Sequence, residues 1–233
     1  MAGTSSYAVP RDVAPALYDS RRDAHYPRPV LRGWMHLVWF AISLAIGGYL
    51  LGRTHGAKQI TAFAIYAATV TGLFGTSALY HRGNWSPTAN RRLQRADHVM
   101  IFVLIAGTAT PEFLLAFPST IGVPAVVAMW TVTLALAGTH LCWMDAPEKL
   151  IGGAFLALGW GAVAAIPAVW TRFGVAAAIL VVVGGVLYTI GAICYHHRRP
   201  DPWPTVFGYH EVFNAYVCVA AACHYVAITA FLL

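Results

Sequence analysis

Long uninterrupted apolar segments dominate the chain, and short polar or charged stretches separate them. A helix needs about 20 apolar residues to cross the roughly 30 Å hydrocarbon layer of a bilayer. Seven segments reach or approach this length, and they cover residues 34–51, 59–80, 99–117, 123–143, 150–170, 173–195 and 206–233. The strict alternation of apolar and polar residues that marks a membrane β-barrel is absent. The pattern therefore predicts an all-α bundle of seven transmembrane helices.

The composition agrees with a membrane protein. Hydrophobic residues make up 58% of the chain and charged residues only 10%, whereas a soluble domain usually carries about 25% charged residues. The seven segments fill most of residues 34–233, so we expect one membrane domain there and a polar tail over residues 1–33. The tail has no short apolar core followed by a small-residue cleavage site, so we expect no removable signal peptide.

Basic residues between the apolar segments predict the orientation, because Lys and Arg in short loops stay on the cytoplasmic side. With the N-terminus inside, the cytoplasmic segments hold twelve basic residues and the opposite loops hold three. The twelve are Arg11, Arg21, Arg22, Arg28, Arg32, Arg82, Arg91, Arg92, Arg95, Lys149, Arg198 and Arg199; the three are Arg53, Lys58 and Arg172. We therefore expect a multi-pass cell-membrane protein with a cytoplasmic N-terminus and an extracytoplasmic C-terminus.

The net charge of +6 does not indicate a nucleic-acid partner. The positive charges border helices, and no folded basic domain presents them to a nucleic acid. Contact with anionic headgroups explains them better, so membrane lipids are the expected partners.

Small residues within the apolar segments predict close helix packing. The pairs Gly152–Gly153 and Gly184–Gly185 would let neighbouring helices approach, within one chain or in a homo-oligomer. The four cysteines also lie in apolar segments, without a CxxC spacing, so we interpret them as small core residues. They are Cys142, Cys194, Cys218 and Cys223.

Five histidines lie at the helix ends expected on the cytoplasmic side. They are His36, His81, His98, His140 and His210. Ionisable groups at membrane depth are costly and mark functional sites by default. By contrast, His55 lies on the outer side, and His224 follows His210 by 14 residues, about 21 Å deeper along a helix. One end of the bundle is thus the predicted location of the chemistry.

Residue spacing places some of these groups on shared helix faces. Ser77 and His81 are four residues apart, and so are His210 and Asn214. Asp97 lies at the expected start of the third helix, where the helix dipole favours a carboxylate. Imidazoles from separate helices are typical zinc ligands. The pattern therefore indicates a zinc site where Asp97 would accept a proton from a water that Ser77 holds by hydrogen bond.

A structural interpretation competes with this one, because a lone His or Ser near a helix end is more often a packing residue than a ligand. Ser77, Asp97, His81 and His210 are expected at one depth in the membrane, and this combination favours a functional site over separate packing residues. For His36 and His140 we favour a structural role. His196 and His197 are expected at a solvated helix end, and His224 is expected to be a buried hydrogen-bonding residue.

Four segments, in order along the seven-helix pattern, resemble the hemolysin III branch of the progestin and adipoQ receptor family. They are Arg-Gly-Trp-Met-His at 32–36, Gly-Thr-Ser-Ala-Leu-Tyr-His at 75–81, Arg-Ala-Asp-His-Val-Met-Ile-Phe at 95–102 running into 105–111, and Gly-Tyr-His-Glu-Val-Phe-Asn at 208–214 with Cys-His-Tyr at 223–225. Each segment is weak alone, but their order makes the set specific.

The resemblance implies a zinc ion near the cytoplasmic face, bound by His81, His210 and a second histidine on the last helix. Asn214 occupies that last position, and its neutral amide oxygen is a poorer zinc ligand than imidazole. Metal affinity should therefore fall, unless water or Glu211 completes the ligand shell. Ser77 and Asp97 correspond to residues that position a water, which implies lipid amide hydrolysis as in ceramidases.

Three functions are compatible with these residues. The first is a zinc-dependent hydrolase of a ceramide-like lipid amide, with a role in membrane lipid homeostasis. The second is a pore-forming hemolysin, although the segments lack a polar stripe to line a channel. The third is a lipid receptor or sensor in which zinc is structural.

Overall fold

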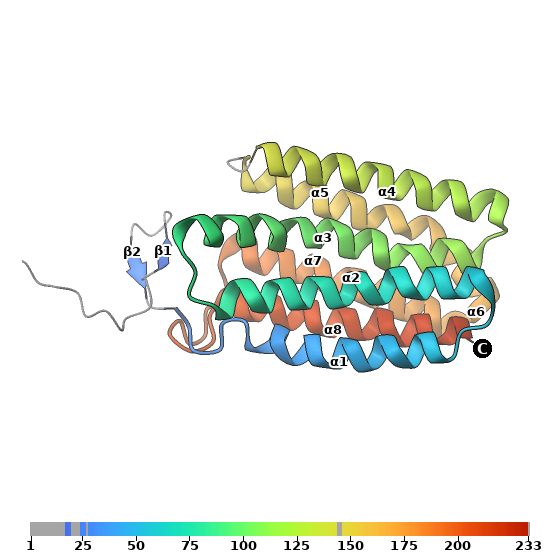
Figure 1. Ribbon diagram of the computed structural model, residues 1–233, viewed down its shortest axis with the longest axis horizontal. Coiled ribbons are helices and arrows are strands. Elements are labelled where there is room, and N and C mark those ends of the chain that lie inside the picture. Colours follow the sequence, from blue (N-terminus) through green and yellow to red (C-terminus); the bar gives the residue numbers. More distant parts are fainter. Residues whose placement is uncertain (1–16, 20–23, 27, 144–145, 233) are drawn as a thin grey trace, which may run out of the picture.

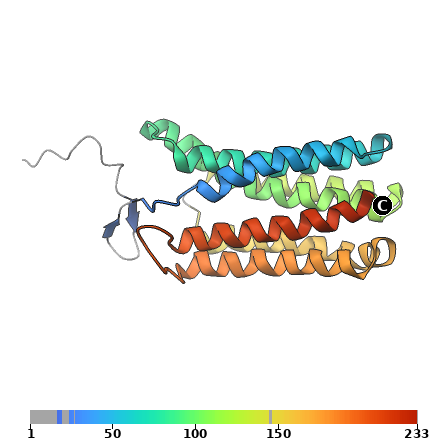
Figure 2. The same cartoon turned by 90° about the horizontal axis from the view of Figure 1, so that it is seen from below.

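The structure, a computed structural model, describes residues 17–19, 24–26, 28–143 and 146–232. Seven helical spans in this part of the chain are long and apolar enough to cross a membrane, which confirms the predicted bundle. Their helices run nearly parallel to one long axis (Figures 1 and 2). The described strands of the N-terminal tail, residues 17–19 and 24–26, and the end of the last helix lie at opposite ends of the bundle (Figure 1). Which end is cytoplasmic stays a prediction.

Eight α-helices and a short 3-10 segment form the seven spans. They are α1 (Trp34–Gly52), α2 (Gly56–Arg82), α3 (Pro87–Ala116), α4 (Ser119–Cys142), α5 (Glu148–Gly161), η1 (Ala162–Ala165), α6 (Ile166–Phe173), α7 (Val175–His197) and α8 (Tyr209–Thr229), with η2 (Ala230–Leu232) at the end. The fifth span, expected to be one helix, is divided into α5, η1 and α6. This division falls just before Pro167, which has no backbone N–H to continue the hydrogen-bond pattern.

The third helix begins twelve residues earlier than expected. Apolar length alone placed its start at Val99, but α3 begins at Pro87, and the Ser86 hydroxyl accepts a hydrogen bond from the Ala89 amide. Proline in the first helical turn and serine as N-cap explain this start. Asp97 therefore lies inside α3, about three turns from its N-terminus, and the expected stabilisation by the helix dipole does not apply.

The last helix and the tail also differ from the prediction. Helix α8 begins at Tyr209 rather than at residue 206, and the Glu211 carboxylate caps it by accepting a 2.9 Å hydrogen bond from the Gly208 amide. Two short strands, β1 (Leu17–Asp19) and β2 (Ala24–Tyr26), pair antiparallel within the tail. The apolar pattern gave no sign of this pairing.

Helix α3 is the most buried span and packs against α2 and α4, with further contacts to α5, α6 and α8. Helices α7 and α8 pack together, as do α1 and α2. The core contains Phe63, Tyr66, Phe74 and Phe102, each at most 2% exposed. Many large apolar residues on the outer faces are exposed, as expected for helices that face lipid.

Of the four glycines predicted to allow close helix packing, only Gly184 lies close to a neighbouring helix. A Cβ on Gly184 would lie 2.5 Å from Cδ2 of His224, so α7 approaches α8 closely there. A Cβ on Gly152, Gly153 or Gly185 would have no neighbour within 4 Å in the described chain. The cysteines are likewise not all core residues: Cys218 is buried, Cys194 and Cys223 are half-buried, and Cys142 is exposed.

Candidate functional site

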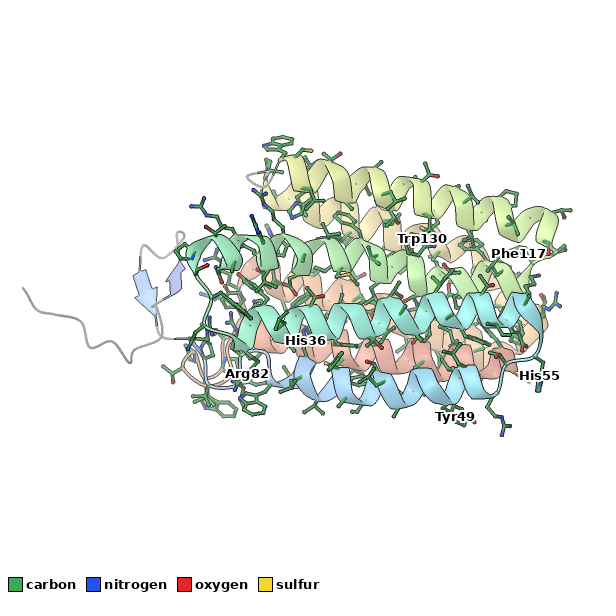
Figure 3. All side chains as sticks on the ribbon, viewed as in Figure 1. His36, Tyr49, His55, Arg82, Phe117 and Trp130 are labelled. Atoms are coloured by element: carbon green, nitrogen blue, oxygen red, sulfur yellow. The ribbon has the colours of Figure 1, made fainter. Side chains whose placement is uncertain are left out.

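Helices α1, α2, α3 and α8 bring polar side chains together at the end of the bundle next to the N-terminal tail. In Figure 3, His36 and Arg82 lie at this end, while His55 and Phe117 lie at the opposite one. Helix α2 ends here and α8 begins here, so His81 and His210 meet although they are 129 positions apart in the sequence. The expected clustering of polar groups at one end of the bundle is therefore seen among the described residues.

The first contact joins α1 to α2. Nδ1 of His36 and Oγ of Ser77 share a hydrogen bond of 2.7 Å, and both side chains are buried. The Ser77 hydroxyl also interacts with the carboxyl group of Asp97 on α3. Ser77 thus lies between an imidazole and a carboxyl group.

The second contact joins α2 to α3 and α8. Nε2 of His81 lies 3.8 Å from Oδ2 of Asp97, and the imidazole rings of His81 and His210 are 4.8 Å apart between centroids, nearly perpendicular. The His210 ring also contacts the ring of Tyr195 on α7, at 5.4 Å. Asp97 can therefore exchange a proton with a group or a water held beside His81.

Several buried polar atoms in this region have no hydrogen-bond partner among the described residues. They include Nε2 of His36, Nε2 of His81 and both amide atoms of Asn214, whose side chain is 1% exposed. A buried polar atom without a partner costs about 1–3 kcal/mol. Such a set at one place is what a site for a polar ligand, water or metal ion requires.

Some donor atoms of this region suit zinc. The His81 and His210 imidazoles and the unpartnered Asn214 oxygen are atoms that zinc can accept. No group of three His, Cys, Asp or Glu side chains in the described chain is placed to hold a metal ion. Asn214 occupies the position at which the family resemblance implies a third imidazole. A zinc ion bound by His81 and His210 therefore stays a prediction.

An ion pair of two buried residues ties this region to the start of α1. Nε of Arg32 donates to Oε1 of Glu211, and both side chains are buried. The other carboxylate oxygen of Glu211 caps α8, one residue after His210. The pair therefore fixes the beginning of α8, and with it the position of His210. Glu211 is committed to Arg32 and to the helix cap, which leaves it poorly suited to complete a zinc shell.

Other histidines form separate pairs. Nδ1 of His98 lies 3.3 Å from Nε2 of His140, beside the main cluster. His224, expected to be a buried hydrogen-bonding residue, is buried, and its Nδ1 lies 3.4 Å from Oε1 of Glu112. This second pair lies far along α8 from His210, so it does not belong to the main cluster.

Sequence reasoning missed Glu112, although a carboxylate inside an apolar segment is a visible signal at membrane depth. Arg32 was named as a topology signal and as part of the motif at 32–36, without a partner. His36 was given a structural role, and its hydrogen bond to Ser77 is compatible with that role. The sequence offered no signal for the partners of Arg32 and His36, because those contacts depend on how α1 packs against α2 and α8.

The comparisons with known proteins point to the same family. The family profile described as "Haemolysin-III related" matches residues 24–225. A hemolysin-3 homolog of Bacillus subtilis (strain 168) is 27% identical over 166 residues, which cover 71% of this chain and 75% of that protein. The heptahelical transmembrane protein ADIPOR2 of Oryza sativa subsp. japonica is 27% identical over 192 residues, covering 76% of this chain and 84% of the relative. The chain therefore belongs to the hemolysin III family, a multi-pass membrane branch of the progestin and adipoQ receptor superfamily.

Proposed function

We propose that this protein is a zinc-dependent hydrolase of a ceramide-like lipid amide and contributes to membrane lipid homeostasis. The observation that carries the proposal is the buried cluster in which Ser77, Asp97 and the His81–His210 pair meet. A lipid headgroup can approach this end of the bundle at the level of the membrane interface. Zinc, when bound to His81 and His210, would supply Lewis acidity that polarises a carbonyl group.

Asp97, Ser77 and His36 then have separate roles in the reaction. Asp97 accepts a proton from the attacking water while the oxygen of that water adds to the amide carbonyl carbon. The C–N bond breaks, and the proton returns from Asp97 to the leaving amine, so that a carboxylic acid and an amine are released. Ser77 orients the water through its hydroxyl group, and His36 orients Ser77 through the 2.7 Å hydrogen bond.

The test combines metal content with turnover. Zinc per chain and fatty acid released from a short-chain ceramide are measured for the purified wild type and for His81→Ala, His210→Ala and Asp97→Asn. We expect the two histidine variants to lose zinc. We expect Asp97→Asn to keep zinc and to lose about 100-fold or more in turnover, the size of a general-base contribution.

A matched histidine control is His55→Ala, because His55 is exposed at the opposite end of the bundle. It should leave both zinc and turnover unchanged. Equal zinc content in wild type, His81→Ala and His210→Ala would remove the basis of the proposal.

The same residues would also serve a lipid sensor with a structural zinc ion. Turnover separates the two functions, because a sensor would lose zinc in the histidine variants but would release no fatty acid in any form. A pore-former, which the names of the relatives suggest for those proteins, would instead release dye from liposomes. We expect no leakage from liposomes that contain this protein.

A further inference from the structure

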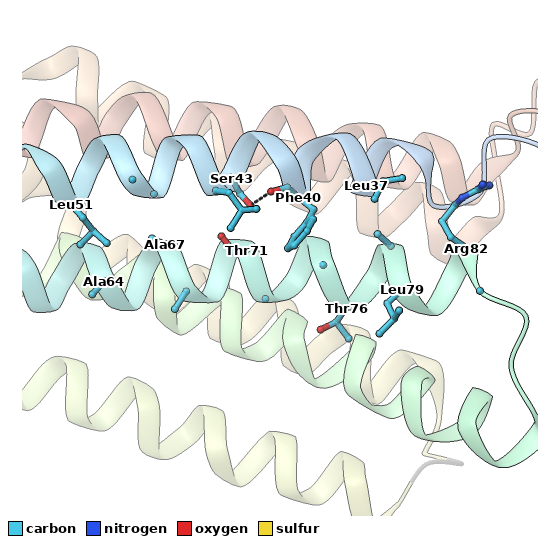
Figure 4. A pocket seen from close by; sticks show the side chains of 18 of the residues that line it. Leu37, Phe40, Ser43, Leu51, Ala64, Ala67, Thr71, Thr76, Leu79 and Arg82 are labelled. Carbon is cyan, nitrogen blue, oxygen red and sulfur yellow. Dashed lines mark hydrogen bonds between the residues drawn. The ribbon is translucent and has the colours of Figure 1, made fainter.

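A long groove runs along the outer face of the bundle between α1 and α2. Figure 4 shows it with Arg82 at one end and Leu51 and Ala64 at the other. Its volume is about 1170 Å³, somewhat above the roughly 300–1,000 Å³ typical of sites for small ligands. The groove is thus large enough to hold an elongated molecule.

Small residues hollow the groove, and its lining is mostly apolar. Gly47, Gly48, Ala67 and Gly72 line its floor and walls. From Arg82 to Ala64 the groove follows 18 residues of α2, about 27 Å at 1.5 Å per residue. One leaflet of the hydrocarbon layer is about 15 Å deep. The groove is therefore longer than one leaflet is deep, so an extended acyl chain of a lipid in that leaflet fits along it.

The end of the groove near the N-terminal tail is basic. The Arg82 guanidinium lies 4.0 Å from the centre of the Trp34 ring, and Arg28 donates a 3.4 Å hydrogen bond to the carbonyl of Gly83, which lines the groove. No carboxylate of the described residues forms an ion pair with Arg82. Burial, followed by the positive charges of Arg32 and Arg82, lowers the pKa of Arg28. An anion at this end would relieve that repulsion.

We propose that the groove between α1 and α2 binds one anionic phospholipid. Its phosphate group lies between Arg82 and Arg28, and one acyl chain lies against the glycine and alanine surface. Arg32 does not take part, because its guanidinium group is already paired with Glu211. This binding is independent of the proposed hydrolysis, because the residues that line the groove do not include Ser77, His81 or Asp97.

A second copy of the chain fits the groove less well. Two copies in one membrane are related by an axis along the membrane normal, so the same ends of the two bundles face each other. With α1 and α2 at the contact, the two Arg82 side chains would meet at one depth and repel. A phosphate group has the charge that this end of the groove requires.

The test uses the purified protein in bilayer discs that contain equal amounts of phosphatidylglycerol and phosphatidylcholine with identical chains. Native mass spectrometry of the released protein then counts the lipids that remain bound. We expect one retained phosphatidylglycerol in the wild type. Arg82→Gln should lower the preference for phosphatidylglycerol about fivefold, the effect of one basic residue near an anionic surface, and Arg82→Lys should keep most of it.

Gly48→Leu tests the apolar part of the groove. A Cβ on Gly48 meets no atom within 4 Å, so a leucine can extend into the groove without a clash. It should reduce the retention of both lipids. Gly185→Leu is the matched control, because Gly185 lies equally open on α7 and outside the groove. Arg92→Gln removes a charge at the same end of the bundle, outside the groove, and controls for net charge.

The outcomes of these experiments distinguish a phospholipid in the groove from a second copy of the chain. Retention of phosphatidylglycerol that is lowered by Gly48→Leu and by Arg82→Gln, but by neither control, supports the site. Equal retention of the two lipids by the wild type overturns it. So does a wild-type dimer that dissociates in Gly48→Leu while lipid retention stays unchanged, because the groove would then bind a second copy.

Discussion

Nδ1 of His36 lies 2.7 Å from Oγ of Ser77, so a residue in the first turn of α1 holds the hydroxyl group at the centre of the polar cluster on α2. Both side chains are buried, at 4% and 3% exposure. A hydroxyl group can rotate freely unless a partner fixes it. We therefore expect His36 to act as a positioning residue for Ser77.

Replacement of His36 by leucine should lower turnover without removing zinc. The loss of one partner of a buried hydrogen bond costs about 1–3 kcal/mol, so we expect kcat to fall about tenfold while the zinc content stays at the wild-type level. His36→Asn is the control, since its amide can still hydrogen-bond Ser77, and it should recover part of the rate. A loss of zinc in His36→Leu would instead make His36 a ligand.

Replacement of Asn214 by histidine should increase zinc affinity. Asn214 lies one helical turn after His210, it is 1% exposed, and both of its amide atoms lack a partner in the described chain. A third imidazole binds zinc better than an amide oxygen. We expect Asn214→His to bind zinc at least about tenfold more tightly in competition with a chelator, which corresponds to about 1.4 kcal/mol.

The matched comparison is Asn214→Leu, which has a similar volume and no donor atom. If Asn214 contributes to the metal shell, zinc affinity falls in this variant. If Asn214 binds nothing, the variant keeps its zinc affinity and becomes more stable, because a buried amide without partners is removed. The two measurements together say whether the present site is weakened or unused.

The fold was largely predictable because the length of an apolar run is a strong physical requirement in a bilayer. The run before Phe117 fixed the existence of α3 but not its start, because residues 87–98 are polar and only the Ser86 cap and Pro87 mark the helix start. The break at η1 was not predicted either. Pro167 alone does not distinguish a kink from an interruption of the helix.

The site was predictable only within single helices. The spacing of Ser77 and His81 fixes a shared face on α2, and the structure brings that face to His210. The contact of His36 with Ser77 depends on the rotation of α1 against α2, and that of Arg32 with Glu211 joins residues 179 positions apart. Periodicity within one helix carries no information about either contact.

Removal of one partner of the Arg32–Glu211 pair should destabilise the start of α8. Both side chains are buried, at 6% and 0% exposure. An unpaired charge left in such a place costs about 3–5 kcal/mol. We expect Arg32→Met to lower the thermal unfolding temperature in detergent strongly, and Glu211→Gln to lower it less, since glutamine can still cap α8 at the Gly208 amide. The double variant should be more stable than the sum of the single effects, and additive losses would show that the two residues are not coupled.

Replacement of Gly184 by alanine should displace His224 from Glu112. The added Cβ would lie 2.5 Å from Cδ2 and 2.6 Å from Nε2 of His224, so the imidazole must move, and its Nδ1 would leave the Oε1 atom of Glu112 at 3.4 Å. Overpacking of this kind costs about 1–3 kcal/mol. Gly185→Ala is the control, because its Cβ meets nothing within 4 Å. Alanine favours the helix by up to about 1 kcal/mol, so this control should be neutral or slightly stabilising.

Gly184→Ala in a His224→Ala background distinguishes a clash with the imidazole from a general effect of the substitution on α7. In His224→Ala the imidazole that obstructs the new methyl group is absent, so Gly184→Ala should cost little there. Thermal unfolding of the four proteins of this cycle in detergent measures the coupling. An equal loss in both backgrounds would mean that Gly184 is required by the helix backbone and not by His224, and the Glu112–His224 pair would then not depend on the close approach of α7 to α8.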